Sequence, residues 1–387
     1  MTAVIKGNKF DSTVKSSNVL GIEEVYTAVK IISESVAMLP CNLLRKDNNG
    51  QISKASNLNA YKLLKRAPNP YTTPYEFMQW LLIDMLINGA GVAIITRDAD
   101  GQPNGLWQQK RSQCVAVRDP EENFELFYDI NLDIGAKVRF PYQDVLVIKS
   151  LNDVGVFGSS IIDKCQTILS IAKASAMYAK DFFSQGIAPS GAVTLDKETT
   201  QDEFEYCKKA VKDFYTGTGN FQQALLLPKG AQFNEINQDN SKLQMLETRK
   251  FNRQVVSSMF RIPLFMYNDG VMSNVEEQGI AFVKFCLLPI LKNIEMRFNL
   301  QLLTDEQFES NYFKFNVDAL ERGNLSSRAQ AESTEVNAGL KTVNESREKE
   351  DLSPVEGGDV LRMNSAIQSL DHSKNAGGSN EYSEGNQ

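Results

Sequence analysis

The hydrophobic pattern of this chain is most distinctive between residues 159 and 303, where three apolar runs are separated by an insert and a polar loop. The first run covers residues 159–186 and the second covers residues 243–261, both at helical spacing. Ser159 or Ser160 is a good N-cap, so we expect a first helix of about 27 residues, roughly 40 Å long. A helix of this length exceeds the globular average and is typical of a helix that projects from its domain as a strut.

The insert has a mixed pattern. It predicts a strand at residues 191–195 that pairs with strands at 224–227 and 232–236. A helix from Thr200 to Tyr215 lies between them. The insert is therefore expected to be a small α/β unit.

The third run, residues 275–303, follows a polar, glycine-containing loop and is interrupted by Pro289. A proline inside a helix removes one backbone hydrogen bond and clashes with the preceding turn. We therefore expect a kink at Pro289, either fixed or mobile. The residues of the preceding loop that we single out are Asn268, Asp269, Gly270, Met272, Ser273 and Asn274.

The first 150 residues mix helices with short alternating segments. Helices are expected at residues 22–39, 59–66 and 73–88, the last with a capping box formed by Thr73 and Glu76. Asn49-Gly50 predicts a hairpin turn. Strands are expected at residues 92–97, 106–109, 114–118, 124–129 and 145–148.

Residues 21–150 thus predict one α+β domain with an antiparallel sheet, and an alternating segment at residues 312–317 is expected to return to the first sheet. Residues 1–20 are expected to be a flexible arm. A helix with little apolar content is expected from Leu325 to at least Val336, and the polar segment from about residue 369 is expected to be disordered.

The chain has 387 residues, of which 42% are hydrophobic, enough for a sizeable core and more than one domain. No apolar run of about 18 residues is free of charge, so no membrane span is expected. The first residues lack an apolar signal core, and we expect a protein that is made and kept in the cytoplasm until it is assembled into something larger.

Residues for most catalytic chemistry are missing. The only histidine, His372, lies in a polar tail, which argues against a catalytic triad or a metal centre. The sequence has no P-loop and no nucleophile elbow. We expect no enzyme activity, no cofactor and no metal. The cysteines are widely spaced and are expected to be buried free thiols: Cys41, Cys114, Cys165, Cys207 and Cys286.

The formal net charge is −7, which disfavours tight binding of nucleic acid but allows DNA to slide past. One basic face stands out on the second predicted strut. It contains Lys242, Arg249, Lys250 and Arg253. This face is either solvated or salt-bridged between subunits, or it forms a ring of charge near passing phosphates. Stacking aromatics are lacking here, so base contact is not expected.

The order of motifs along the chain resembles that of tailed-bacteriophage portal proteins, in particular the compact class of long-tailed phages. The motifs that carry the resemblance are residues 25–40, Pro68-Asn69-Pro70, Gly158-Ser159-Ser160, residues 246–251, residues 260–263, residues 273–278, Gly339, Asn344-Glu345 and Gly357-Gly358-Asp359.

The resemblance implies an α+β portal-type fold that assembles into a ring. Its parts would be the wing at 21–158 with a return strand at 304–323, the stem helices at 159–186 and 241–262, the clip at 187–240, the tunnel loop at 263–275, the kinked helix at 276–303 and the crown at 324–368. Residues 1–20 would be the arm and 369–387 a disordered tail. The C-terminal region is shorter and less apolar than the family's crown.

The resemblance further implies a ring of twelve copies at one capsid vertex that passes double-stranded DNA. Its partners would be the terminase large subunit, the head–tail connector or adaptor, and the major capsid and scaffolding proteins, with no membrane contact. The loop at 268–274 is then either an ordinary surface connection or a mobile loop facing the channel. The alternatives to this function are another virion ring, such as a head–tail adaptor, and a soluble α+β enzyme.

Overall fold

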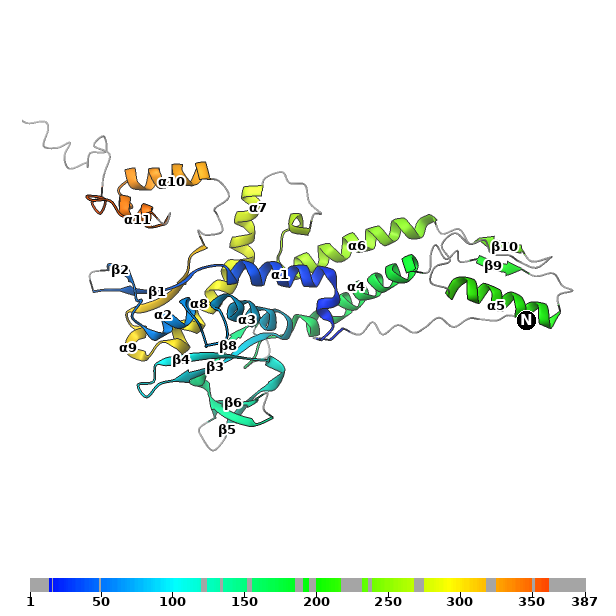
Figure 1. Cartoon of the computed structure of the whole chain (residues 1–387), viewed down its shortest axis with the longest axis horizontal. Helices are drawn as coiled ribbons and strands as arrows, with labels where there is room; N and C mark the ends of the chain where they lie inside the picture. Colours follow the sequence, from blue (N-terminus) through cyan, green and yellow to red (C-terminus); the bar gives the residue numbers. More distant parts are fainter. Residues whose placement is uncertain are drawn as a thin grey trace, which may run out of the picture. The chain divides into compact units, whose positions relative to one another are not determined.

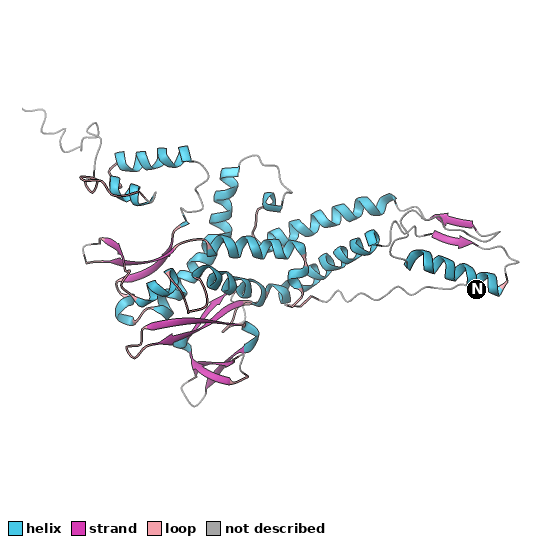
Figure 2. Cartoon of the chain, viewed as in Figure 1, coloured by secondary structure: helices cyan, strands magenta, loops and turns pink. Residues whose placement is uncertain are grey.

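The computed structural model describes residues 14–15, 17–48, 50–119, 124–132, 135–151, 155–184, 191–194, 200–216, 232–235, 239–267, 275–317, 325–349 and 352–361. The chain divides into two compact units, Met1–Val317 and Asp318–Gln387. Helices and antiparallel strands occur together in the first unit, so the fold class is α+β, as predicted (Figures 1 and 2).

The N-terminal part of the first unit pairs with a strand from far along the chain. Its elements are η1 (Val19–Gly21), α1 (Glu23–Ala37), β1 (Cys41–Lys46) and β2 (Ile52–Lys54). Strand β11 (Asn311–Phe315) lies antiparallel to β1, with Cys41 opposite Phe315. This confirms the predicted return of the chain to the first sheet, whose order is β11-β1-β2. Gly50 has a φ of 83° in the hairpin turn, as expected for a glycine at that position.

Two helices follow, α2 (Asn59–Lys65) and α3 (Pro74–Asn88). The predicted capping box at the start of α3 is confirmed. The Thr73 hydroxyl accepts a hydrogen bond from the Glu76 amide, and the Glu76 carboxylate accepts one from the Thr73 amide. Helix α3 ends at Gly89, whose φ of 85° is the left-handed conformation that favours glycine.

The prediction of one antiparallel sheet in this region was wrong, because the strands form separate three-stranded sheets. One has the order β4-β3-β8 and another the order β5-β6-β7. The pattern also missed β7, which is polar and partly exposed. The elements are β3 (Ala90–Arg97), β4 (Pro103–Gln109), η2 (Arg111–Gln113), β5 (Cys114–Asp119), β6 (Glu125–Asn131), β7 (Lys137–Pro141), η3 (Tyr142–Asp144) and β8 (Val145–Lys149).

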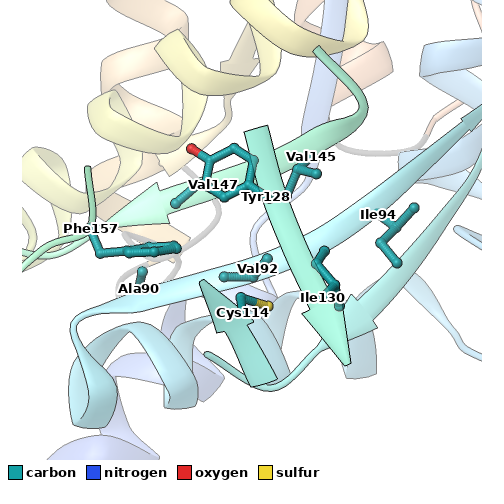
Figure 3. Packing of buried hydrophobic residues seen from close by; sticks show 9 residues of the cluster. All are labelled: Ala90, Val92, Ile94, Cys114, Tyr128, Ile130, Val145, Val147 and Phe157. Atoms are coloured by element: carbon teal, nitrogen blue, oxygen red, sulfur yellow. The ribbon is translucent and has the colours of Figure 1, made fainter. Parts of the chain in front are cut away.

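The two sheets share a hydrophobic core. Alternate residues of β3 and β8 point toward β5 and β6 (Figure 3). The buried residues of this cluster are Ala90, Val92, Ile94, Cys114, Tyr128, Ile130, Val145, Val147 and Phe157. Helix α3 packs against β3, and helix α8 (Leu288–Leu302) packs against β8. The β4-β3-β8 sheet is therefore covered by helices on one face and by a second sheet on the other.

The two long runs form helices α4 (Ile161–Ser184) and α6 (Asp239–Phe260), which pack against each other. Between them in sequence lie β9 (Gly191–Thr194), α5 (Gln201–Thr216) and β10 (Gln232–Glu235), with β9 and β10 antiparallel. The predicted helix and the pairing of 191–195 with 232–236 are confirmed. The predicted strand at 224–227 lies outside the described residues.

After α6 come η4 (Leu264–Tyr267), α7 (Val275–Phe282), a π-helical turn η5 (Val283–Leu287), α8 and the short helix α9 (Asp305–Phe308). Phe298 of α8 packs edge-on against Phe313 of β11, with ring centroids 5.5 Å apart. Helix α8 therefore connects the first sheet to the β4-β3-β8 sheet.

The second unit contains α10 (Leu325–Asn337) and α11 (Val343–Lys349). Its described segment is organised by one buried amide. Asn344 donates from Nδ2 to the Val355 carbonyl and to Asp359, and its Oδ1 accepts from the Val355 amide. A Cβ on Gly358 would stand 2.3 Å from Asn344 Oδ1, so a side chain at this position would displace the amide. These contacts explain why the motifs Asn344-Glu345 and Gly357-Gly358-Asp359 occur together, because Asn344 packs against Gly358 and hydrogen-bonds to Asp359.

Candidate functional site

The base of α4 is held against the end of α3 by backbone contacts. A Cβ on Gly89 would lie 2.3 Å from the Gly158 carbonyl oxygen, and a Cβ on Gly158 would lie 2.4 Å from the Gly89 carbonyl oxygen. The Ser160 hydroxyl donates to the Ile87 carbonyl at 2.8 Å and accepts from the Ile162 amide at 3.1 Å. Ser160 therefore caps α4 and ties it to α3 at the same time.

A cation–π contact next to this joint connects it to the sheets. The Arg111 guanidinium lies 3.6 Å from the centre of the Phe157 ring. The Arg111 amide donates to Asp84 of α3 at 2.7 Å. Burial raises the pKa of Asp84, and hydrogen bonds from Asn88 and from the Arg111 amide partly oppose that rise. The segment just before α4 is thus packed, through Phe157 and Arg111, against α3.

Helix α4 begins at Ile161, directly after the predicted cap Ser160, but it is not regular. Cys165 has φ −117° and ψ 21°, which is outside the helical region, so one turn after its start the helix is interrupted. The hydrophobic pattern does not indicate this interruption, because the apolar spacing continues through Cys165. The segment is therefore two helical pieces joined at a kink rather than one uniform strut.

The predicted basic face on α6 is only partly available to a ligand. Arg249 forms an ion pair at 3.3 Å with Glu23 of α1, within the same chain. Arg253 also has a partner. Lys250 is exposed, whereas the side chain of Lys242 lies outside the described part of the chain. The two predicted roles of this face therefore both remain predictions, with Arg249 paired inside its own subunit.

The end of α6 is a tight turn that the sequence did not predict. Arg261 has a φ of 56°, a left-handed conformation that is uncommon for a residue other than glycine. The Ser257 hydroxyl donates to the Ile262 carbonyl, and the Tyr267 hydroxyl donates to the Glu24 carbonyl at 3.1 Å. Burial raises the pKa of Tyr267. These bonds attach the start of the predicted tunnel loop to α6 and α1.

The predicted loop residues Asn268, Asp269, Gly270, Met272, Ser273 and Asn274 lie outside the described residues. The structure describes both flanks of this loop, η4 before it and α7 after it. The role of the loop as a channel-facing element stays a prediction.

At Pro289 the helical path continues, and a π-helical turn precedes the proline. A proline in a regular α-helix would clash with the carbonyl four residues earlier, which here belongs to Phe285. Phe285 lies inside the π-helical turn, whose wider hydrogen-bond spacing gives the proline ring room. Cys286 of the same turn donates from Sγ to the Phe260 carbonyl at 3.3 Å, and burial raises its pKa to about 12.

Polar side chains of α8 that the sequence analysis did not single out hold the two sheets. Gln301 accepts from the Val147 amide at 3.3 Å and donates to the Val145 carbonyl at 2.6 Å. Glu295 accepts from the Phe315 amide at 2.8 Å, and Asn299 accepts from the Phe313 amide at 2.7 Å. In the sequence, these residues could have been recognised as polar residues at helix positions that face the core. Gln301 is 2% exposed and Glu295 is 6% exposed.

Four cysteines in the described part of the chain are free thiols; Cys41, Cys114 and Cys286 are buried and Cys165 is half-buried. The side chain of Cys207 lies outside the described residues. Over the described ranges, no group of three or more histidine, cysteine or acidic residues is placed to hold a metal ion. Within the same ranges, no helix has the length and apolar content that a membrane crossing requires.

Comparison with known proteins agrees with the motif order. Residues 23–351 match the family model described as phage portal protein. The chain is 24% identical to the portal protein of Enterobacteria phage HK97 over 368 residues, which is 90% of this chain and 83% of that protein. It is 25% identical to the probable portal protein of Streptomyces phage phiC31, over 89% of this chain and 78% of that protein.

Solved structures show the same fold. The crystal structure of an HK97 family phage portal protein from Corynebacterium diphtheriae has a TM-score of 0.62 and 16% identity, and the match covers 82% of this chain and 99% of that one. A chain in the neck of a native gene transfer agent particle, computed with C12 symmetry, has a TM-score of 0.57 and 19% identity over 87% of this chain and 94% of that one. The family model spans most of the sequence, and the resemblance predicted from the motifs is confirmed: this chain belongs to the phage portal protein family.

Proposed function

We propose that twelve copies of this chain form a ring at one vertex of a phage capsid, and that double-stranded DNA passes through the ring during packaging and ejection. Membership of the portal family is the observation that carries the proposal. The C12 symmetry of the related neck structure supports the number of copies. The enzyme and head–tail adaptor alternatives are not favoured by a family match that covers residues 23–351.

The parts of the chain are assigned by the same analogy. The three small sheets with α1, α2 and α3 would be the wing, and the paired helices α4 and α6 the stem. The unit with β9, α5 and β10 would be the clip. Helices α7 and α8 would be the kinked helix, and α10 with α11 the crown. The close backbone packing at Gly158 supports a stem helix whose base is held rigidly against the wing.

The net negative charge of the chain suits a channel that does not bind DNA tightly. Each phosphate neutralised by the protein steepens the salt dependence of binding by about 0.9 log units. A ring of chains that each carry a net charge of −7 repels the duplex on average. Arg249 is already paired with Glu23, which removes one exposed cation from the candidate basic face. We therefore propose a mostly acidic or neutral lumen.

The partners follow from the same proposal. The sequence contains no P-loop, so a separate ATP-driven motor, the terminase large subunit, would supply the work of packaging. The ring would later bind the head–tail connector, and during head assembly it would contact the major capsid and scaffolding proteins. The host cytoplasm would be the place of assembly and the virion the final location.

Native mass spectrometry and electron microscopy of the purified chain test the proposal directly. The expected result is a closed ring of twelve copies with a central hole wide enough for a DNA duplex. In the same preparation, binding of a short duplex should be weak and should depend only slightly on salt, because few phosphates are neutralised, and it should show no preference among sequences. A monomer or a dimer without a hole, at every protein concentration tried, would contradict the proposal.

A further inference from the structure

One face of the long helical segment 275–302 is apolar and uncovered. The side chains of Ile280, Phe285, Leu288, Met296 and Leu300 are 49%, 60%, 36%, 68% and 57% exposed. We call these five residues the outer stripe. Together they extend over α7, the π-helical turn and α8.

The residues of the outer stripe lie on one face because of their spacing, with Lys292 between Leu288 and Met296 at four-residue steps. Met296 and Leu300 are four residues apart and Phe285 and Leu288 are three apart, so each pair shares one helix face. Ile280 and Phe285 are five apart. The π-helical turn closes its hydrogen bonds over five residues, and this brings the two onto a common face.

The opposite face of the same helix is fully engaged. Leu291, Ile294 and Phe298 are at most 1% exposed, and Glu295 and Gln301 bind the backbone of β11 and β8. Helix α8 therefore has no freedom to rotate and bury the outer stripe within its own sheets. Large apolar side chains that remain exposed along one stripe mark an interaction surface.

We infer that the outer stripe is a contact face between neighbouring copies of this chain. The inference rests on the proposed ring. In a closed ring the contacts are heterologous, so the stripe would meet a different surface of the next copy rather than the same stripe. Helix α8 would then hold two sheets of its own subunit with one face and the neighbour with the other.

Charge supports a second copy as the occupant. The exposed charged side chains along the stripe, among the described ones, are Lys284, Glu277 toward its start, and Lys292, which forms an ion pair at 2.6 Å with Glu295 of the same helix. Lys284 also lies 5.5 Å from the centre of the Phe285 ring. A face that carries the exposed cation of Lys284 among its apolar side chains suits the surface of a chain whose net charge is −7. DNA is a poor fit, because five apolar side chains offer nothing to phosphates.

Methionine oxidation tests this inference on the unmodified chain. Ring and monomer fractions are separated by size, treated with hydrogen peroxide, and the conversion of each methionine to its sulfoxide is followed by peptide mass spectrometry. Met38, directly after α1, is 62% exposed and is the reference for an accessible methionine. We expect Met296 and Met38 to react at similar rates in the monomer, and Met296 to react about tenfold more slowly in the ring.

The other outcomes overturn the inference. If Met296 reacts equally fast in ring and monomer, the stripe is not at the contact, although the ring itself stands. If Met296 is protected in both forms, another part of the same chain covers it. If no ring forms under any condition, the proposed function fails together with the inference.

A matched pair of substitutions gives a second readout. Leu300→Glu places a charge in the stripe, whereas Leu151→Glu places the same charge on a side chain that is 70% exposed outside it. Leu300→Glu should raise the protein concentration needed for half-maximal ring formation about tenfold or more, and Leu151→Glu should not. Both monomers should keep the wild-type circular dichroism spectrum. Equal effects of the two substitutions would contradict the assignment.

Discussion

Gly89 and Gly158 approach so closely that neither position has room for a side chain. Each would-be Cβ lies 2.3–2.4 Å from the carbonyl oxygen of the other glycine. Backbone atoms cannot move aside as the end of a flexible side chain can. The joint between α3 and α4 therefore depends on two residues that contribute no side chain at all.

Gly158→Ala should destabilise the protein by roughly 2–4 kcal/mol, because the added methyl also meets the Ser150 amide nitrogen at 2.7 Å. Gly279→Ala is the matched control. Gly279 lies inside α7 with nothing within 4 Å of its would-be Cβ, so alanine there should stabilise by about 0.5–1 kcal/mol. Urea denaturation of the two variants should give shifts of opposite sign. Shifts of the same sign and size would count against the described joint.

Gln301→Leu should cost about 2–4 kcal/mol, because it leaves the buried Val147 amide and Val145 carbonyl without partners while nearly conserving volume. Gln254→Leu, on an exposed position of α6, is the control and should change stability by less than about 0.5 kcal/mol. Chemical denaturation followed by tryptophan fluorescence measures both. A small effect of Gln301→Leu would mean that water replaces the amide easily.

The capping box of α3 should make stability depend on pH. The Thr73 backbone amide, and then its hydroxyl, donate hydrogen bonds that lower the pKa of Glu76 below its ordinary value of 4.5. A lowered pKa in the folded state stabilises the fold above the unfolded-state pKa, and this contribution is lost as pH falls through the folded-state pKa. Glu76→Gln should therefore flatten the decline in melting temperature between about pH 5 and pH 3.

Thr73→Ala is the companion variant for this prediction, because it removes the hydroxyl donor and the N-cap while leaving the carboxylate. It should also reduce the pH dependence. A wild-type slope in both variants would show that other carboxylates control acid stability.

Arg249→Ala should have little effect on stability, less than about 1 kcal/mol, because its ion pair with Glu23 is exposed on both sides. If the basic face does not touch DNA, the slope of log affinity against log salt should also stay unchanged. One lost phosphate contact would reduce that slope by about 0.9. Fluorescence anisotropy with a labelled duplex, with Lys250→Ala in parallel, distinguishes the two predicted roles of this face.

Local chemistry explains which elements the sequence predicted well. Thr73 and Glu76 act within four residues of each other, and Gly50 acts within one turn, so their effect is visible in the sequence. The alternation of residues 312–317 predicted a strand that returns to the first sheet, whereas its pairing with β1 is known only from the structure. The division into separate small sheets was not predictable, since strand alternation is the same in one sheet or in three.

The missed site residues act over long sequence distances. Arg111 contacts the ring of Phe157, and Gln301 accepts a hydrogen bond from Val147. Neither pair lies at a sequence spacing that would indicate a contact. The interruption at Cys165 and the left-handed Arg261 depend on the packing around them, since neither residue type favours its conformation. The family resemblance indicated the order of the parts, but only the coordinates give the joints between them.

The hydrogen bonds from α8 to β8 and β11 also cover two sheet edges. Each of these strands is the last in its sheet, with a row of backbone groups that a foreign strand could extend. Gln301, Glu295 and Asn299 occupy part of that row on both strands. These two edges are therefore partly closed to strand addition, which disfavours edge-to-edge pairing between copies of the chain.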